Sequence, residues 1–308
     1  MPLTSLSKYP AFGVLLGLFG ALIITPDTLF MRLSEMDVWV MMVWRGLQMG
    51  GFLLLVWLAY ALFSYTADKR AADMMALFSW QGLTAVGAII FGGVTFVYGI
   101  AETSVSIVLF SLACSPLFAA LFSAILLKEK THAATWITMV VSLVGIALTV
   151  WGGDEAVAAP KGSVLIGALC GLSTAAALGL NFVMFRSRSD IPLLLANGLG
   201  AFITGLIGLF VLGASATGLS VVFTGNLLAI SVSGLFILPV SFMALTAATR
   251  FTRAANVSLF MLLETVLGPV WVWLGTGERP GLLTICGGVI VVLSLAAYIR
   301  LLLKTDNS

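Results

Sequence analysis

The stretch Ala101–Glu129 reads AETSVSIVLFSLACSPLFAALFSAILLKE, and the stretch Arg250–Glu278 reads RFTRAANVSLFMLLETVLGPVWVWLGTGE. They align without a gap, and the alignment pairs Thr103 with Thr252, Leu112 with Met261, Pro116 with Thr265 and Glu129 with Glu278. Each copy begins with a polar entry, continues as an apolar span and ends at an acid just beyond that span. The chain therefore contains one unit twice, and each copy closes one half of the 308 residues.

Apolar residues dominate the composition, with 60% hydrophobic and 9% charged residues. A soluble domain carries roughly a quarter charged residues, so most of this exterior must face lipid. The net charge of +2 is too small to indicate a nucleic-acid partner. Three cysteines lie inside apolar runs, and the single His132 excludes a multi-histidine site. We therefore expect neither a metal nor a cofactor.

Long apolar runs recur along the whole chain, and about 20 such residues cross a bilayer core as a helix. Ten runs are predicted, at Phe12–Met31, Val38–Phe63, Met75–Ile100, Ser104–Leu127, Ala133–Trp151, Gly162–Phe185, Ile191–Leu212, Leu227–Ala248, Ala254–Thr276 and Leu282–Leu303. They are continuous rather than alternating, which favours helices over barrel strands. The loop from Asp154 to Pro160 divides the chain into two five-helix halves, 1–155 and 156–308.

Lysine and arginine placement predicts the orientation of these spans. With the N-terminus inside, the cytoplasmic side holds Lys8, Lys69, Arg70, Lys128, Lys130, Arg186, Arg188, Arg250, Arg253, Arg300 and Lys304. The other side holds Arg32, Lys161 and Arg279. The positive-inside rule then places both termini in the cytoplasm, in an inner (plasma) membrane protein. Five spans per half make the two copies inverted repeats, a feature of secondary transporters.

The paired halves resemble EamA-type members of the drug/metabolite transporter superfamily. The family's repeat ending is matched in the first half by Ser115-Pro116-Leu117-Phe118-Ala119-Ala120 and Lys128-Glu129, and in the second by Leu263-Glu264-Thr265-Val266-Leu267-Gly268-Pro269 and Gly277-Glu278-Arg279-Pro280. The Trp44-Arg45 pair matches an arginine common in that family. One departure is that Thr265 stands where the family often has proline, while Pro269 follows a turn later. The resemblance implies this fold and the efflux of amino acids, related metabolites or toxic compounds.

Three charged residues inside spans are candidates for binding substrate or protons. A charge at the bilayer centre costs at least about 2.5–3.5 kcal/mol, so a charged residue there is expected to have a structural or functional role. Glu264 lies near the midplane and is interpreted as a substrate-cation ligand or a proton-binding group; a structural glutamate between helices is the alternative. Asp27 and Arg45 lie at matching depths in neighbouring antiparallel spans, which predicts a salt bridge. That pair either fixes helix packing or forms an outer gate.

Neutral polar residues and prolines complete the candidates. Asn181, Asn256 and Tyr98 are candidates for the lining of a central cavity, with interhelical hydrogen bonds as the alternative for the asparagines. Three in-span prolines are either hinges or static kinks: Pro116, Pro239 and Pro269. Three glycine pairs indicate tight helix packing and fit either a monomer or a homodimer: Gly13/Gly17, Gly46/Gly50 and Gly167/Gly171.

The leading hypothesis is a secondary active transporter that moves a small metabolite by alternating access. Its partners would be a small-molecule substrate and membrane lipid. No Walker-type motif occurs, so this chain does not use ATP. The alternatives are a facilitative channel and an uptake permease for a small organic solute. An intramembrane enzyme would need clustered His, Asp or Cys at one depth, which the scattered acids do not offer, so no enzyme is expected.

Overall fold

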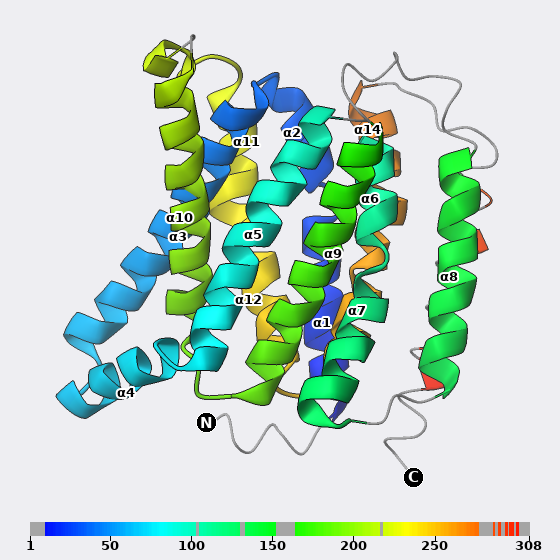
Figure 1. The fold of residues 1–308 in the computed structure, drawn as a ribbon, viewed down its shortest axis with the longest axis horizontal. Helices are drawn as coiled ribbons and strands as arrows, with labels where there is room; N and C mark the ends of the chain where they lie inside the picture. Colours follow the sequence, from blue (N-terminus) through cyan, green and yellow to red (C-terminus); the bar gives the residue numbers. More distant parts are fainter. Residues whose placement is uncertain are drawn as a thin grey trace.

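The structure is a computed structural model that describes residues 10–102, 105–129, 133–151, 164–215 and 218–276, and short pieces between 286 and 301. The regular elements of these residues are all helices, and the long ones run up and down one bundle (Figure 1). In chain order they are α1 (Pro10–Ile24), α2 (Asp27–Ser34), α3 (Val38–Phe63), α4 (Ala67–Leu77), α5 (Trp80–Glu102), α6 (Val105–Leu112), α7 (Ser115–Phe122), η2 (Ser123–Leu127), α8 (Ala133–Trp151), α9 (Val164–Ser187), α10 (Leu193–Ala214), η3 (Gly218–Val221), α11 (Leu227–Val232), η4 (Ser233–Ile237), α12 (Leu238–Ala248), α13 (Ala254–Phe260) and α14 (Leu262–Thr276).

Seven helical stretches of the described chain are long and apolar enough to cross a membrane. They are Ala11–Ser34, Val38–Phe63, Trp80–Ile100, Leu165–Ser187, Leu193–Ala214, Leu227–Ala248 and Ala254–Gly275. Two shorter apolar helices, Ser115–Leu127 and Ala133–Gly145, accompany them. The predicted last span, Leu282–Leu303, lies largely outside the described residues. The chain is thus an all-helical, multi-pass membrane protein.

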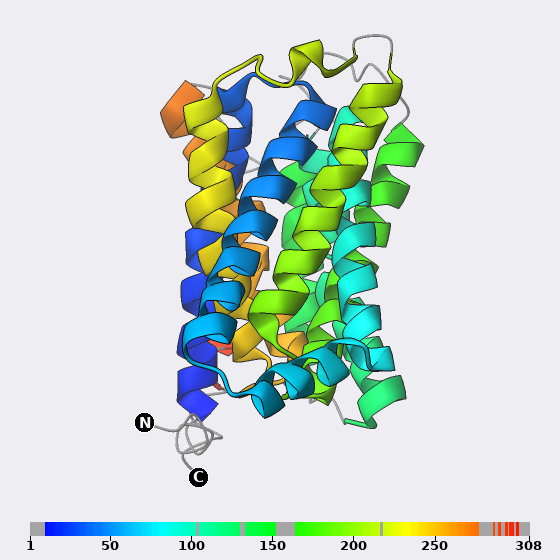
Figure 2. The same cartoon turned by 90° about the vertical axis from the view of Figure 1, so that its left-hand side faces the viewer.

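The start of the third predicted span differs from the structure. Its helix α5 begins at Trp80 rather than Met75, because residues 67–77 form the separate helix α4. Helix α4 lies across the lower end of the bundle (Figures 1 and 2). An ion pair joins Lys69 to Asp73, and the Trp57 indole N–H donates to Asp73 Oδ2 over 3.1 Å. Charged side chains of this kind are costly inside lipid, so we expect this segment to lie at the membrane surface.

Several spans are interrupted in mid-course. Helix α1 ends before Thr25-Pro26, where proline cannot donate a backbone hydrogen bond. In the repeated stretch, α6 ends at Leu112, and α13 gives way to α14 at Met261, the residue aligned with Leu112. The second break has no proline; instead the Glu264 N–H donates to the Met261 carbonyl three residues back, a tighter turn than an α-helix makes.

The break at Met261 shows where the ninth span is interrupted, although Thr265 replaces the proline that is common in the family motif. The ninth span breaks four residues before Thr265, and α14 continues through Pro269. The two copies of the repeat therefore break within two residues of the same aligned position, although only the first has a proline close after it.

The glycine pairs of the sequence lie where helices of the same chain pack closely together. Helix α3 packs along α10, and a Cβ on Gly46 would lie 2.4 Å from the Gly205 nitrogen. A Cβ on Gly50 would lie 2.3 Å from the Phe202 nitrogen. A Cβ on Gly13, Gly17 or Gly171 would likewise come close to Phe251, Phe260 or Ser111, respectively. These motifs bring helices of one chain together, and whether the protein is a monomer or a homodimer stays a prediction.

Candidate substrate cavity

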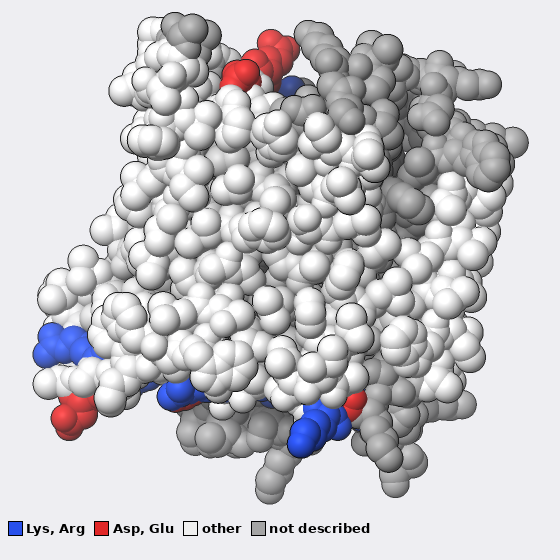
Figure 3. Space-filling view, in the orientation of Figure 1, with Lys and Arg blue, Asp and Glu red and all other residues white. Residues whose placement is uncertain are grey.

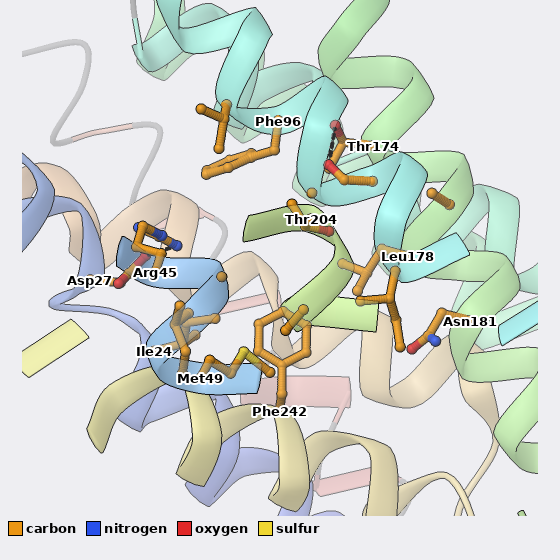
Figure 4. A pocket seen from close by; sticks show the side chains of 18 of the residues that line it. Ile24, Asp27, Arg45, Met49, Phe96, Thr174, Leu178, Asn181, Thr204 and Phe242 are labelled. Atoms are coloured by element: carbon orange, nitrogen blue, oxygen red, sulfur yellow. Dashed lines mark hydrogen bonds and ion pairs between the residues drawn. The ribbon is translucent and has the colours of Figure 1, made fainter. Parts of the chain in front are cut away.

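A cavity of about 160 Å³ lies in the middle of the bundle, and helices from both halves of the chain line it. Its wall is mostly apolar, with Ile24, Met49, Phe96, Leu178 and Phe242 among the side chains in Figure 4. A protein cavity of about 150 Å³ accommodates a molecule the size of benzene. The space is therefore suited to a small organic solute.

The interrupted spans converge on this cavity. Leu112 and Met261, the aligned break positions, both line it. Ile24 and Asp27, which flank the break in the first span, line it as well. Leu238 adds the end of η4, a π-helical turn of a kind often found at functional sites. Helix breaks expose backbone groups and helix ends, which membrane transporters use to bind solutes.

Asp27 and Arg45 form the predicted salt bridge on one side of the cavity. Arg45 Nη2 lies 2.7 Å from Asp27 Oδ2, and their side chains are 11% and 2% exposed. Asp27 is the first residue of α2, where the helix dipole favours a negative charge. The Ser233 hydroxyl of η4 donates to Asp27 Oδ1 over 2.5 Å. Spans one, two and eight are thus joined by a single carboxylate.

Glu264 lies in the first turn of α14 and borders the same cavity. Only 4% of it is exposed, and the charges of both Asp27 and Arg45 act on it. Arg45 Nη1 is buried without a hydrogen-bond partner in the described chain. The cavity wall therefore holds two acids, Asp27 and Glu264, and one base, Arg45. The Nη1 group of Arg45 is available to donate a hydrogen bond to a ligand.

Asn181 of α9 lies across the cavity from this charged group (Figure 4). Its Nδ2 donates to the Ala85 carbonyl of α5 over 3.2 Å, whereas its Oδ1 is buried without a partner in the described chain. Thr174 and Thr204 also line the cavity, and each donates to a carbonyl one turn back on its own helix. Sequence reasoning did not single out these threonines or Ser233, because hydroxyl residues that bond to their own backbone are ordinary in membrane helices.

The other two binding candidates lie outside this cavity. The Tyr98 ring lies 6.0 Å from the Trp39 ring, and Tyr98 is 36% exposed. Asn256 belongs to a buried polar network in which its Oδ1 accepts from the Tyr298 hydroxyl over 2.6 Å. Its Nδ2 donates to Thr252 Oγ1 over 2.9 Å, and Tyr298 hydrogen-bonds to Thr135. This network joins α8, α13 and the last described helical segment.

Two of the three hinge candidates lie beside interruptions at the cavity. Pro116 is the second residue of α7, directly after the break in the fourth span. Pro239 is the second residue of α12 and follows the π-helical turn η4. Pro269 lies within α14, where the helix continues. Their role as hinges stays a prediction.

Two arginines link several segments at the lower end of the bundle. Arg186 Nε donates to Glu129 Oε1 over 3.3 Å, and Arg186 Nη1 donates to the carbonyls of Thr249 and Arg250. Arg250 Nη2 donates to the Ile191 carbonyl over 2.6 Å. The segments that meet here also carry fully buried apolar side chains, namely Phe182, Phe185, Ile191 and Leu245. The lower ends of four spans are thereby held together.

Charge is unevenly distributed between the two ends. On the face in Figure 3, nearly all visible lysine and arginine side chains lie at the lower end, whereas acidic side chains are visible at both ends. Next to the arginine network, a hydrogen bond from the exposed Arg188 guanidinium holds the pKa of Asp190 below its ordinary value. A charged rim at one end and an apolar belt above it are typical of a membrane protein seen from the side.

Comparisons with known proteins agree with this arrangement. Residues 11–151 match the EamA-like transporter family. The Bacillus subtilis (strain 168) protein named "Uncharacterized transporter YdfC" is 26% identical over 242 residues, which cover 78% of this chain and 77% of that protein. A solved crystal structure is similar with a TM-score of 0.75 over 96% of this chain and 99% of its own, at 15% identity, which shows the fold alone. The chain is therefore a membrane transporter of small solutes, and its residues 11–151 match the EamA-like transporter family.

Proposed function

We propose that this protein is a secondary active transporter that exports a small metabolite, an amino acid or a related compound, across the inner (plasma) membrane by alternating access. One observation carries the proposal: a small apolar cavity lies where interrupted helices meet, and one side of it holds two acids and a base. The proposal assigns no enzymatic step, cofactor or nucleic-acid partner to the chain.

The charged group suits the two ends of an amino acid. A carboxylate placed beside Arg45 accepts from the guanidinium nitrogen Nη1, which has no partner in the described residues. An ammonium group placed beside Glu264 and Asp27 meets their carboxylates. The side chain of the substrate then lies against the apolar wall. When no substrate is bound, Glu264 holds a proton instead, which couples export to proton entry.

The proposed architecture has ten spans in two inverted five-helix halves, 1–155 and 156–308. Helix packing supports it, because exchanging the halves converts the α5–α9 pair into the α12–α1 pair, and both pairs are in contact. The same exchange maps the α3–α10 contact onto itself and the α7–α13 contact onto the α14–α6 contact, which is also present. The aligned breaks at Leu112 and Met261 add further support. Such repeats exchange roles when a transporter rocks between its two states.

The proposed orientation places the lower end and both termini in the cytoplasm. Support comes from the arginines and lysines at that end, because positive charge favours the cytoplasmic side. In this orientation the arginine network lies at the cytoplasmic end, where a rocking transporter needs contacts that form and break. A facilitative channel needs a continuous polar path, and the few polar residues in the spans favour the transporter. An uptake permease with the same fold differs only in the direction of the driving gradient.

The test begins with a ligand screen on the purified full-length protein. Amino acids, nucleosides, vitamins and cationic drugs are compared by thermal shift, and ligands at 100 times their Kd stabilise by about 2.7 kcal/mol. We expect the stabilising compounds to be amino acids or related zwitterions. Proteoliposomes preloaded with such a compound should take up the labelled compound faster than empty ones. Uptake that is indifferent to preloading would indicate a channel, and stabilisation by another class alone would exclude the amino-acid assignment.

A further inference from the structure

Asn181 has a hydrogen-bonding capacity that the proposed charged group does not use. It lines the cavity, is 2% exposed and lies on the side opposite Asp27 and Arg45 (Figure 4). The wall around it is apolar, with Leu178 and Ala177 from its own helix. A polar side chain at such a place is costly unless its hydrogen bonds are made.

The contacts of Asn181 fix which way its amide faces. Its nitrogen Nδ2 donates to the Ala85 carbonyl, and a carbonyl can only accept, so the NH2 group must be the part that faces α5. Figure 4 shows the oxygen Oδ1 on the side of Leu178, another residue that lines the cavity. This oxygen is buried and has no hydrogen-bond partner in the described chain. Asn181 therefore offers an acceptor, held in place by the α5–α9 packing.

Building on the proposed function, we propose that Asn181 is a specificity-determining residue that accepts a hydrogen bond from the far end of the substrate. The substrate class is then a small amino acid or related zwitterion whose side chain bears a hydroxyl, amide or amine donor. Its charged groups lie beside Arg45 and Glu264, its carbon body contacts the apolar wall, and its donor reaches Oδ1. A compound with a purely hydrocarbon side chain leaves Oδ1 unpaired, and sites of this kind reject such analogues strongly.

The experiment compares matched substrate pairs in proteoliposomes of the full-length protein. The probes are L-threonine against L-valine and L-tyrosine against L-phenylalanine, since each pair differs in one hydroxyl. For wild type we expect the initial rate for the hydroxyl-bearing member of the pair that fits the cavity to be at least about tenfold higher. For Asn181→Leu we expect a ratio near one, with transport of the hydrocarbon member retained or improved.

Asn197 supplies a matched control on α10. It is also a buried asparagine whose Oδ1 has no partner in the described residues, but it does not line the cavity. Its Nδ2 donates to the Leu193 carbonyl and to Thr246 Oγ1. Asn197→Leu should change thermal stability and leave the hydroxyl preference at its wild-type value.

Each outcome bears on the inference. Equal wild-type rates for both members of a transported pair overturn it and leave the transport proposal intact, as does a ratio unchanged by Asn181→Leu. If neither pair is transported and only compounds other than amino acids or related zwitterions stabilise the protein, the amino-acid assignment falls and this inference falls with it. If another zwitterion stabilises the protein, the same comparison is made with that compound and its analogue without the side-chain donor. If Asn181→Leu does not fold, the same rate ratio is measured for Asn181→Ala. The inference is then tested by that ratio and by the wild-type ratio.

Discussion

At the scale of single residues, Glu264 and the Asp27–Arg45 pair form one electrostatic unit. Both Asp27 and Arg45 act on Glu264, and all three line one cavity. The sequence predicted the pair from matching depths in neighbouring spans and singled out Glu264 because a charge in lipid is costly. It did not place Glu264 beside the pair, because residues 27 and 264 meet only through tertiary packing of the first and ninth spans.

Neutralising Glu264 tests its role in transport. We expect Glu264→Gln to remain folded and to lose transport by about 10- to 100-fold, or to transport without coupling to protons, because one charge-assisted hydrogen bond is worth about 1.5–3 kcal/mol. Initial rates in proteoliposomes at several pH values measure this. Glu35→Gln, at an exposed residue just after α2, serves as the control and should behave as wild type. Wild-type rates and pH dependence for Glu264→Gln would make Glu264 structural.

At the scale of helices, the crossing of α3 and α10 depends on missing side chains. A Cβ on Gly50 would lie 2.3 Å from backbone, whereas a Cβ on its neighbour Gly51 would meet nothing within 4 Å. The glycine spacing in the sequence predicted close packing, but it gave no partner. Only the folded chain shows that α10 is the partner.

Two alanine substitutions one residue apart test this crossing. Gly50→Ala should lower the free energy of unfolding by about 1–3 kcal/mol, because the added methyl group forces α3 and α10 apart. Gly51→Ala should have little effect or stabilise by up to about 1 kcal/mol, since alanine favours helix. Denaturant unfolding of the protein in detergent compares the two. Equal losses would mean that the α3–α10 contact does not limit stability.

The helix interruptions show a second limit of sequence reasoning at this scale. Apolar runs predicted continuous spans, and prolines were the visible candidates for bending. The structure interrupts the ninth span at Met261, which carries no recognisable signal of its own, while α14 continues through Pro269. The sequence also did not predict α4 as a separate helix. Its apolar end at Met75–Leu77 is continuous in the sequence with the apolar run of the following span.

At the scale of the whole molecule, two arginines link segments of both halves at the lower end of the bundle. Arg186 reaches Glu129 after η2 and the carbonyls after α12, and Arg250 reaches the loop before α10. In an alternating-access cycle these contacts must break when the cavity opens downward. The network is therefore the expected site of the inner gate in the proposed cycle.

Loosening this network should open the lower end. In a protein whose native cysteines are replaced, Thr249→Cys provides a buried reporter at that end. We expect Arg186→Gln to increase its labelling by an impermeant maleimide several-fold, applied to inside-out vesicles. Arg188→Gln removes a neighbouring exposed ion pair with Asp190 and should leave labelling unchanged. Equal labelling in all three proteins would show that Arg186 does not hold the end closed.

The sequence by itself determined the class of the molecule. Composition, run length and the repeated stretch predicted an all-helical, multi-pass membrane protein of the transporter type, because lipid leaves a chain few choices: its spans must be apolar, helical and about 20 residues long. Charge placement added an expected orientation, which is a prediction for topology mapping. Tertiary structure decided the site. It joined Asp27, Arg45, Glu264 and Asn181 around one cavity and left Tyr98 and Asn256 elsewhere. The physical reason is that lipid constrains each span separately, whereas a cavity depends on which helix faces meet, and that is fixed by close packing between residues far apart in the chain.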